Sequence, residues 1–211
     1  MTEDVRIRGY RAADLDALYR ISLATGDGGG DASALYRDPR LIGHVYVGPY
    51  AALCPEALLV AEDAGGVAGY VLGAIDTRGF EARQEAEWWP ALRAAHPDPA
   101  GIPPERRTAD EQRRHRFHHP LRMPDALLEA YPSHLHINLL PRLQGRGVGR
   151  RLIGRWLELA RAAGSRGAHL GVSAANRRAL GFYRACGFQE LPVSVAAAPA
   201  AVWFGVRLES L

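Results

Sequence analysis

The chain has 211 residues, of which 47% are hydrophobic, so it is long enough and apolar enough to bury the core of one domain. Its 26 basic side chains are all arginine and are offset by 23 acidic ones, and the net charge of +3 is too small to indicate a nucleic-acid partner. No apolar run approaches the ~20 residues of a membrane helix and no secretory signal pattern is visible, so the sequence predicts a cytoplasmic protein without a membrane partner.

The N-terminal part predicts a strand followed by a helix. Residues 5–10 have the pattern of a short edge strand, and Asp14 offers an N-cap to an amphipathic helix that starts at Leu15. The helix is expected to end at residues 25–30, where three consecutive glycines favour a loop. We expect this loop to border a substrate cleft.

The middle of the chain predicts a hairpin followed by an insertion. Two β-rich runs, 56–63 and 67–76, are joined by a glycine turn and predict antiparallel strands. The pattern then weakens over residues 78–132, which hold most of the chain's 14 prolines and are interpreted as an insertion. Because a structureless loop of ~50 residues is uncommon, helices are expected at 80–95 and 125–130. The arginine-rich segment 105–116 is interpreted as a solvated face, with too few aromatic side chains to stack nucleic-acid bases.

The remaining elements predict an α/β (α+β) fold in a single domain over residues 1–211. Residues 134–140 form a predicted strand and residues 148–163 an amphipathic helix. Residues 168–172 predict a second strand, parallel to the first. A further helix is expected at 176–186, followed by two strands within 191–208.

The turn between the predicted strand and helix has the character of a phosphate site. Gly145, Gly147 and Gly149 leave backbone N–H groups unobstructed at the helix start. These groups have no intrahelical partner, and the helix dipole adds partial positive charge, so the turn can hold a pyrophosphate. The side chains expected to add charge for further phosphates are those of Arg142, Arg146 and Arg150.

Two common pyrophosphate-binding patterns are excluded. A P-loop needs a lysine, and the chain contains none. The dinucleotide fingerprint needs an acidic residue about twenty positions downstream, and no acidic residue occurs between Glu158 and Glu190.

The glycine turn resembles the cofactor signature of the GNAT superfamily of N-acetyltransferases. Residues 144–149 read Gln-x-x-Gly-x-Gly, and residues 176–188 match that superfamily's Asn-x-x-Ala-x-x-Phe-Tyr-x-x-x-Gly-Phe at every specified position. Further stretches resemble a narrower group, the bacterial relatives of the acetyltransferase-like C-terminal domain of O-GlcNAcase. These stretches are 46–55, 69–77, 87–90 and 131–137.

The resemblance implies the GNAT fold, a mixed, mostly antiparallel central sheet of about seven strands flanked by helices. The sheet would be splayed between strands 4 and 5, with the helical insertion, approximately 78–132, between strands 3 and 4. It also implies acetyl-CoA as cofactor and co-substrate. The residues expected to bind this cofactor are Ile137, Asn138, Leu139, Gln144, Gly145, Arg146, Gly147, Val148, Gly149, Arg150, Asn176, Ala179, Phe182 and Tyr183.

The resemblance further implies an N-acetyltransferase in which an amine of a small molecule, protein or peptide attacks the thioester directly. Backbone groups of Ile137 and Leu139 would pair with the pantetheine arm, which Asn176 would also bind. The Leu139 N–H would stabilise the developing negative charge, and Tyr183 would protonate the leaving thiolate.

The general base is less well defined, because many relatives carry a glutamate at the position that is Gly171 here. The favoured catalytic residue is His134, with His136 as an alternative, since an ordinary histidine pKa of ~6.5 suits proton pickup at neutral pH. Asp76, acting through water, is a third candidate. We expect a cleft lined by Asp76, His134 and the region of Gly28.

Other readings remain open at this point. The chain could be an acetyl-CoA-binding module with little or no transferase activity. No metal is expected, because the histidines 115, 118, 119, 134 and 136 match no standard zinc spacing. A monomer and a dimer are equally compatible with the sequence.

Overall fold

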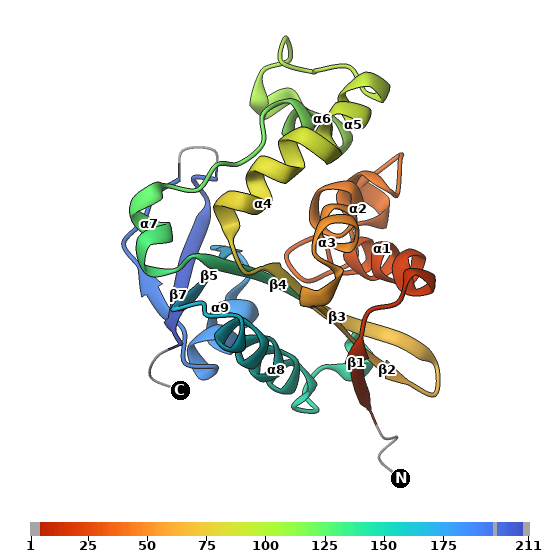
Figure 1. Ribbon diagram of the computed structural model, residues 1–211. Coiled ribbons are helices and arrows are strands. Elements are labelled where there is room, and N and C mark those ends of the chain that lie inside the picture. Colours follow the sequence, from red (N-terminus) through yellow and green to blue (C-terminus); the bar gives the residue numbers. More distant parts are fainter. Residues whose placement is uncertain (1–4, 196–197, 209–211) are drawn as a thin grey trace.

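The computed structural model describes residues 5–195 and 198–208, and the strands of these residues form one seven-stranded sheet (Figure 1). The strand order is β1-β2-β3-β4-β5-β7-β6, and neighbours are antiparallel except β4 and β5. The predicted mixed, mostly antiparallel sheet is therefore confirmed. The strands are β1 Arg6–Gly9, β2 Leu58–Asp63, β3 Gly66–Ala74, β4 Ser133–Leu139, β5 Gly167–Ser173, β6 Gln189–Leu191 and β7 Ala201–Arg207.

Helices cover both faces of the sheet (Figure 1). One face carries α8 Val148–Ala162 and α9 Arg177–Ala185, whereas the opposite face carries α1 Leu15–Ala24, α2 Leu41–Tyr46, α3 Gly48–Leu53 and α4 Thr77–Arg83. Farther from the sheet lie α5 Trp89–Ala95 and α6 Ala109–His118, while α7 Asp125–Ala130 packs near β7. No helix of the described residues is both long and apolar enough to cross a membrane.

The predicted periodicity of α8 is confirmed by its burial. Val148, Leu152, Trp156 and Ala160, spaced at four-residue intervals, are all buried in the core beneath this face. Trp156 is fully buried, and its indole N–H donates to the Ala57 carbonyl oxygen at 2.9 Å. The helix is thereby fixed to the chain that enters β2.

The start of α1 corrects one prediction. Asp14 directly precedes the helix, but its carboxylate does not cap the helix. It accepts hydrogen bonds from the Arg8 guanidinium at 2.7 and 2.9 Å and from the Arg11 N–H at 2.8 Å. Asp14 thus occupies the predicted N-cap position, but the capping hydrogen bond is absent because the buried ion pair with Arg8 engages the carboxylate.

This ion pair makes stability depend on pH. The hydrogen bond from Arg8 is the main cause that holds the pKa of Asp14 below its ordinary value. A lowered folded-state pKa adds stability above the ordinary value of ~3.9, and that stability is lost as the pH falls through the folded pKa. We expect Asp14→Asn to lower the free energy of unfolding at pH 7 by about 1–3 kcal/mol in urea titrations.

The matched control is Asp16→Asn, because Asp16 forms an exposed pair with Arg40. Its effect should stay within about 1 kcal/mol. The stability difference between wild type and Asp14→Asn should shrink below about pH 4. A difference that is constant from pH 7 to pH 3 would contradict the assignment.

The helix predicted at 80–95 is present but begins earlier and is interrupted. It starts at Thr77, where the Asp76 carboxylate accepts from the Gly79 N–H at 3.0 Å. A π-helical turn, Gln84–Trp88, separates α4 from α5. Pro90 lacks the N–H that would continue the regular ladder, which accounts for the irregular turn at this point.

The segment predicted as a solvated arginine face is largely a packed helix, so that interpretation is wrong for α6. Phe117 is fully buried and stacks on Trp89 with ring centroids 6.0 Å apart. The buried Asp110 carboxylate accepts from the Arg37 N–H at 3.0 Å. The helix begins with a capping box that joins Thr108 and Glu111, a signal that the sequence does contain.

Candidate active site

The parallel strands β4 and β5 part soon after they meet. Their pairing is restricted to Ser133 with Ala168 and His134 with His169. The predicted splay between these strands is therefore confirmed. Beyond His134, the edge of β4 that faces β5 has no neighbouring strand among residues 5–195 and 198–208.

Backbone alternation determines which groups line this gap. The Leu140 N–H donates to Ala68 on the β3 side at 2.8 Å, so the N–H groups of Leu139 and Ile137 point to the opposite side. The Leu139 carbonyl oxygen, on that same side, accepts from Gln144 Nε2 at 2.7 Å. Gln144 thus fastens the glycine turn to the end of β4, and the gap retains N–H donors.

The glycine turn has the geometry of an anion site. Gly145 and Gly147 have φ of 71° and 73°, in the left-handed region, and Gly147 directly precedes α8. The Arg151 N–H bonds back to Gly147 at 3.1 Å, so the N–H groups before it have no intrahelical partner. A Cβ at Gly149 would lie 3.0 Å from the Phe182 ring, which shows how closely α8 approaches α9.

All three arginines near the turn have partners within the fold, and Arg146 donates to the Arg142 carbonyl oxygen at 3.3 Å. Arg142 pairs with Asp63 of the β2–β3 hairpin at 2.9 Å, so its predicted role as a free phosphate ligand is not supported. Arg150 donates to the Ala185 carbonyl oxygen at 2.9 Å and so ties α8 to α9. A diphosphate at this turn would therefore be held chiefly by backbone N–H groups and the helix dipole.

The second motif forms the start of α9 and its buried face. Asn176 caps α9 by accepting from the Ala179 N–H at 3.0 Å. The Asn176 amide nitrogen faces the loop at residues 25–30, since a Cβ added at Gly29 would lie 3.4 Å from this nitrogen. Tyr183 is 7% exposed among aromatic side chains, and burial raises its pKa, so its hydroxyl is protonated at neutral pH.

A cavity of about 400 Å³ opens where β4 and β5 part. Its walls are mostly apolar and aromatic. They include Tyr46, Tyr50, Phe80, Trp89 and Trp203, together with His134, Leu135 and His136 of β4 and Leu170, Gly171, Val172 and Ser173 of β5.

The predicted lining of the cleft is only partly right. His134 lines the cavity, whereas Asp76 and Gly28 do not. Asp76 is exposed at the start of α4 and serves as its N-cap. The loop that contains Gly29 lies instead beside Asn176 at the start of α9.

Two histidines of β4 and Tyr50 of α3 form a hydrogen-bonded chain beside the cavity. The Tyr50 hydroxyl lies 2.8 Å from His134 Nε2 and 3.1 Å from His136 Nε2. On its other side, His134 Nδ1 lies 2.8 Å from the Thr77 hydroxyl, which donates to the Pro132 carbonyl oxygen at 2.7 Å. Both ring nitrogens of His134 are therefore engaged.

The balance of donors and acceptors determines the direction of each bond in this chain. Because Thr77 donates its only hydroxyl proton to Pro132, His134 Nδ1 must carry a proton and donate to Thr77. His134 Nε2 then accepts the Tyr50 proton, which leaves the Tyr50 oxygen to accept from His136 Nε2–H. His136 consequently keeps an unprotonated Nδ1.

Burial keeps these histidines neutral. It lowers the pKa of His134 well below 6.5 and that of His136 to about 4. His169, whose ring lies 5.7 Å from that of His134, has its pKa lowered to about 4 by burial as well. All three rings are therefore uncharged at pH 7.

Gly171 is a glycine for a steric reason. A Cβ at this position would lie 3.0 Å from the indole ring of Trp203, which reaches over β5 from β7. Trp203 is 5% exposed, and its indole nitrogen is buried without a hydrogen-bond partner among the described residues. The indole ring thus lies against the position at which many relatives carry a glutamate, a contact that the sequence alone did not suggest.

We expect Gly171→Ala to lower the free energy of unfolding by about 1–3 kcal/mol, because Trp203 must move to admit the methyl group. The control is Gly181→Ala in α9, where nothing lies within 4 Å of an added Cβ. This control should be neutral or stabilising by about 1 kcal/mol. Urea unfolding of both variants tests the packing, and an unchanged Gly171→Ala would contradict it.

The chain is similar to an acetyltransferase family, to O-GlcNAcase and to several solved structures. Residues 125–188 match the acetyltransferase (GNAT) family. The chain is 27% identical over 186 residues to Protein O-GlcNAcase of Rattus norvegicus, and equally to that of Mus musculus. These alignments cover 88% of this chain but 20% of the relatives, so the chain spans about a fifth of their length.

Solved structures share the whole fold. The crystal structure of SsHAT is 35% identical, with a TM-score of 0.86 over 97% of this chain and 98% of that one. PH1933 from Pyrococcus horikoshii OT3 is 14% identical, with a TM-score of 0.60 over 97% and 98% of the two chains. The structure of yncA from Salmonella typhimurium, which contains its cofactor acetyl-CoA, is 18% identical, with a TM-score of 0.54 over 97% and 94%.

Proposed function

Since the chain belongs to the GNAT family of acetyltransferases, which use acetyl-CoA as their cofactor, we propose that it acetylates a primary amine by direct attack. The observation that carries this proposal is the hydrogen-bonded chain of His136, Tyr50 and His134 on the wall of the cavity. These side chains lie beside the opening between β4 and β5, where an acceptor for the amine's proton would be needed if the acetyl donor binds there.

The residues around the opening fit acetyl-CoA. The left-handed glycines 145 and 147 present N–H donors for its diphosphate, and the splayed edge of β4 presents the N–H groups of Ile137 and Leu139 for its pantetheine arm. When bound, acetyl-CoA supplies an acetyl group activated as a thioester. The remaining predicted cofactor residues belong to β4, the turn, α8 and the start and body of α9, and among them Asn138 donates its side-chain amide to the Thr25 hydroxyl.

His136 is the group best placed to accept the proton that the amine loses. Its Nδ1 is unprotonated, whereas both nitrogens of His134, the base favoured from the sequence, are already engaged. As His136 Nδ1 takes a proton, its Nε2 proton can pass to Tyr50 while the Tyr50 proton passes to His134 Nε2. The positive charge then resides on His134, whose Nδ1–H stays bonded to Thr77.

Tyr183 is proposed as the acid that protonates the leaving sulfur. Its raised pKa means that the hydroxyl still carries its proton at neutral pH. The rings of Phe182, Phe188 and Phe204 pack around the Tyr183 ring. The Leu139 N–H would stabilise negative charge at the acyl oxygen.

The acceptor is proposed to be a small molecule or an amino group of a protein or peptide, bound mainly by aromatic walls. The cavity contains one carboxylate, Glu81, which accepts from the Met123 N–H at 2.8 Å and pairs with Arg78. No carboxylate in this lining is therefore free to hold an ammonium group, and attraction of the cation to ring faces is the available alternative.

The proposal is tested by incubating the protein with acetyl-CoA and a panel of amines and peptides, with release of free CoA as the readout. Acetylated product, identified by mass spectrometry, would support it. Calorimetry on the same material measures acetyl-CoA binding separately. Binding without release on any acceptor would favour the acetyl-CoA-binding module instead.

A further inference from the structure

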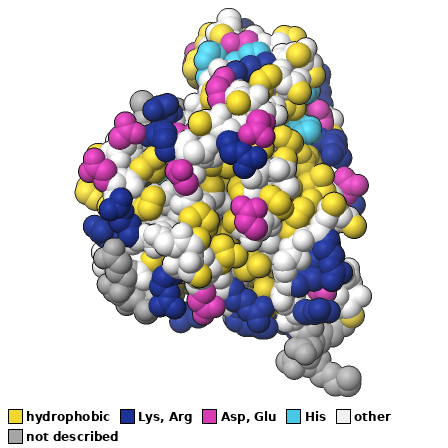
Figure 2. All heavy atoms as spheres, viewed as in Figure 1, with side chains coloured by type: hydrophobic (Ala, Val, Ile, Leu, Met, Phe, Trp, Pro, Cys, Tyr) yellow, Lys and Arg dark blue, Asp and Glu magenta, His cyan; other side chains and the backbone are white. Residues whose placement is uncertain are grey.

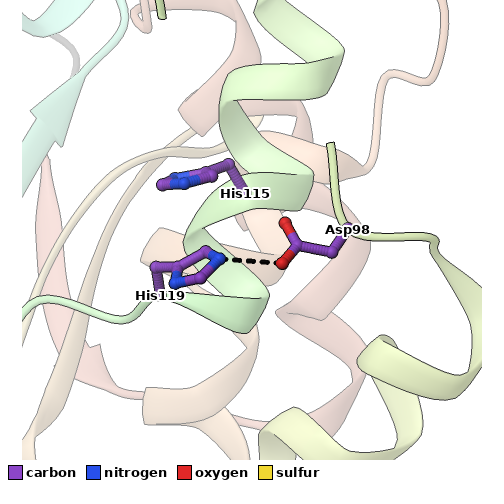
Figure 3. A group of neighbouring side chains, drawn as sticks. All are labelled: Asp98, His115 and His119. Carbon is purple, nitrogen blue, oxygen red and sulfur yellow. Dashed lines mark hydrogen bonds and ion pairs between the residues drawn. The ribbon is translucent and has the colours of Figure 1, made fainter. Parts of the chain in front are cut away.

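Three metal-ligating side chains converge in the insertion, and none of the three lines the cavity. His115 lies in the last turn of α6, His119 directly follows that helix and donates its backbone N–H to the His115 carbonyl oxygen at 2.8 Å, and Asp98 lies in the segment between α5 and α6 (Figure 3). One ligating atom from each lies within 4.8 Å of the others. In Figure 2, histidine side chains gather at this end of the molecule beside acidic and arginine side chains.

We propose that Asp98, His115 and His119 bind one divalent transition-metal ion of the Zn²⁺ class. Two histidines four positions apart on a helix face the same side, and imidazole nitrogens with a carboxylate oxygen form a ligand set typical of zinc. Three protein ligands leave one position for water. The ion would cross-link the segment after α5 to the end of α6.

The imidazole rings must turn before they can close around an ion, because the lone pair of each ring lies in its own plane and stacked rings cannot both point at one ion. The rings of His115 and His119 are stacked with centroids 4.2 Å apart, and His119 Nε2 already lies 2.8 Å from Asp98 Oδ2 (Figure 3). Bonds of ~2.0 Å in a tetrahedral site require ligand atoms roughly 3.3 Å apart. The side chains of His119 and Asp98 are 48% and 30% exposed, so rotation about their side-chain bonds can supply the difference.

The backbone that carries these ligands is held independently of any ion. His118 Nε2 lies 2.8 Å from the His96 carbonyl oxygen, which fixes the chain two residues before Asp98. Arg93 of α5 donates to the Phe117 carbonyl oxygen of α6 at 2.8 Å. The two segments that carry the ligands are therefore already joined by two hydrogen bonds close to the proposed site.

The charges nearby limit the affinity. Arg107 and Arg116 act on the charge of His115, and both oppose a further positive charge. We therefore expect binding in the micromolar range rather than the far tighter binding of sites with several thiolates. The role assigned to the ion is structural. It would hold the end of α6 in place, and α6 supplies Arg116 to the wall of the cavity.

The test uses the whole chain after removal of metal with a chelator. Calorimetry should show one Zn²⁺ bound per chain, and Co²⁺ should give the visible absorption of a low-coordinate nitrogen and oxygen site. His115→Ala and His119→Ala should each weaken Zn²⁺ binding by at least ~10-fold. Gln112→Ala, at an exposed position of the same helix outside the ligand set, should bind Zn²⁺ like the wild type.

A second set of measurements guards against variants that merely fold poorly. Asp98→Asn keeps the size of the side chain and removes its charge, so it should weaken Zn²⁺ binding while thermal unfolding without metal stays close to wild type. Zn²⁺ should slow hydrogen exchange in residues 96–108 of the wild type but not of His115→Ala. Equal Zn²⁺ affinity in the wild type and His115→Ala would overturn the proposal and leave only the hydrogen bond between His119 and Asp98.

Discussion

Replacement of His136 by glutamine is expected to lower kcat for amine acetylation by about 10²- to 10⁴-fold. The glutamine amide can still donate to the Tyr50 oxygen, as His136 Nε2–H does, but it offers no nitrogen that can take up a proton. The affinity for acetyl-CoA should change little, because this side chain lies on the wall of the cavity rather than at the glycine turn. Steady-state kinetics and calorimetry on the same preparation measure the two effects separately.

Variants of the hydrogen-bonded chain and of one histidine outside it provide the controls. Tyr50→Phe leaves His136 in place but removes the link to His134, so a smaller loss is expected. His96→Gln alters a histidine outside the cavity lining and should leave turnover unchanged. Greater loss in His134→Gln than in His136→Gln would show that His134 takes the proton directly.

The pH profile gives an independent readout of this base. A base acts only when unprotonated, so the activity that depends on His136 is lost as the pH falls through its folded pKa. Burial lowers that pKa to about 4, and the same change affects its neighbours His134 and His169. The acidic limb of kcat/KM assigned to this cluster should therefore lie well below the ordinary histidine value of ~6.5.

Replacement of Tyr183 by phenylalanine is expected to lower turnover by about 10²-fold while the affinity for acetyl-CoA stays nearly the same. The ring would still fill its place among Phe182, Phe188 and Phe204, so only the proton donor is lost. Release of free CoA under saturating acceptor measures the effect. Tyr10→Phe, which alters a ring packed against the opposite core, is the matched control.

Wild-type turnover in Tyr183→Phe would remove Tyr183 from the acid role. A parallel loss of acetyl-CoA affinity would instead indicate a part in binding. Thermal unfolding of the variant distinguishes either result from a general loss of structure.

The half of the site assigned to the acetyl donor was predictable because its parts are close together in the sequence. The strand, the glycine turn and the helix from 133 to 162 form one continuous segment, and their periodicity and glycine spacing are visible directly. Structure was needed to show that Gln144 binds the Leu139 carbonyl and that Arg142 pairs with Asp63. The roles assigned to individual residues of this half stay predictions.

The half that faces the acceptor could not be assembled from the sequence. Tyr50 is 84 residues from His134, and Thr77 is 57 residues from it, so no spacing rule connects them. The packing of α6 depends on similarly remote contacts, such as that of Asp110 with Arg37, 73 residues away. Local patterns report helices and strands, whereas such contacts are determined by the tertiary arrangement alone.

The bridge that Gln144 makes between β4, the glycine turn and Arg178 of α9 has a consequence for how the protein could diversify. These bonds join β4, the glycine turn and α9, which together form the half of the site assigned to acetyl-CoA, so a change in one of them affects the others. The segment 78–132, by contrast, contributes Phe80, Glu81 and Trp89 to the opposite wall without taking part in those bonds. Exchange of this segment between homologues could therefore alter which molecules are admitted, while the machinery that delivers the acyl group is inherited intact.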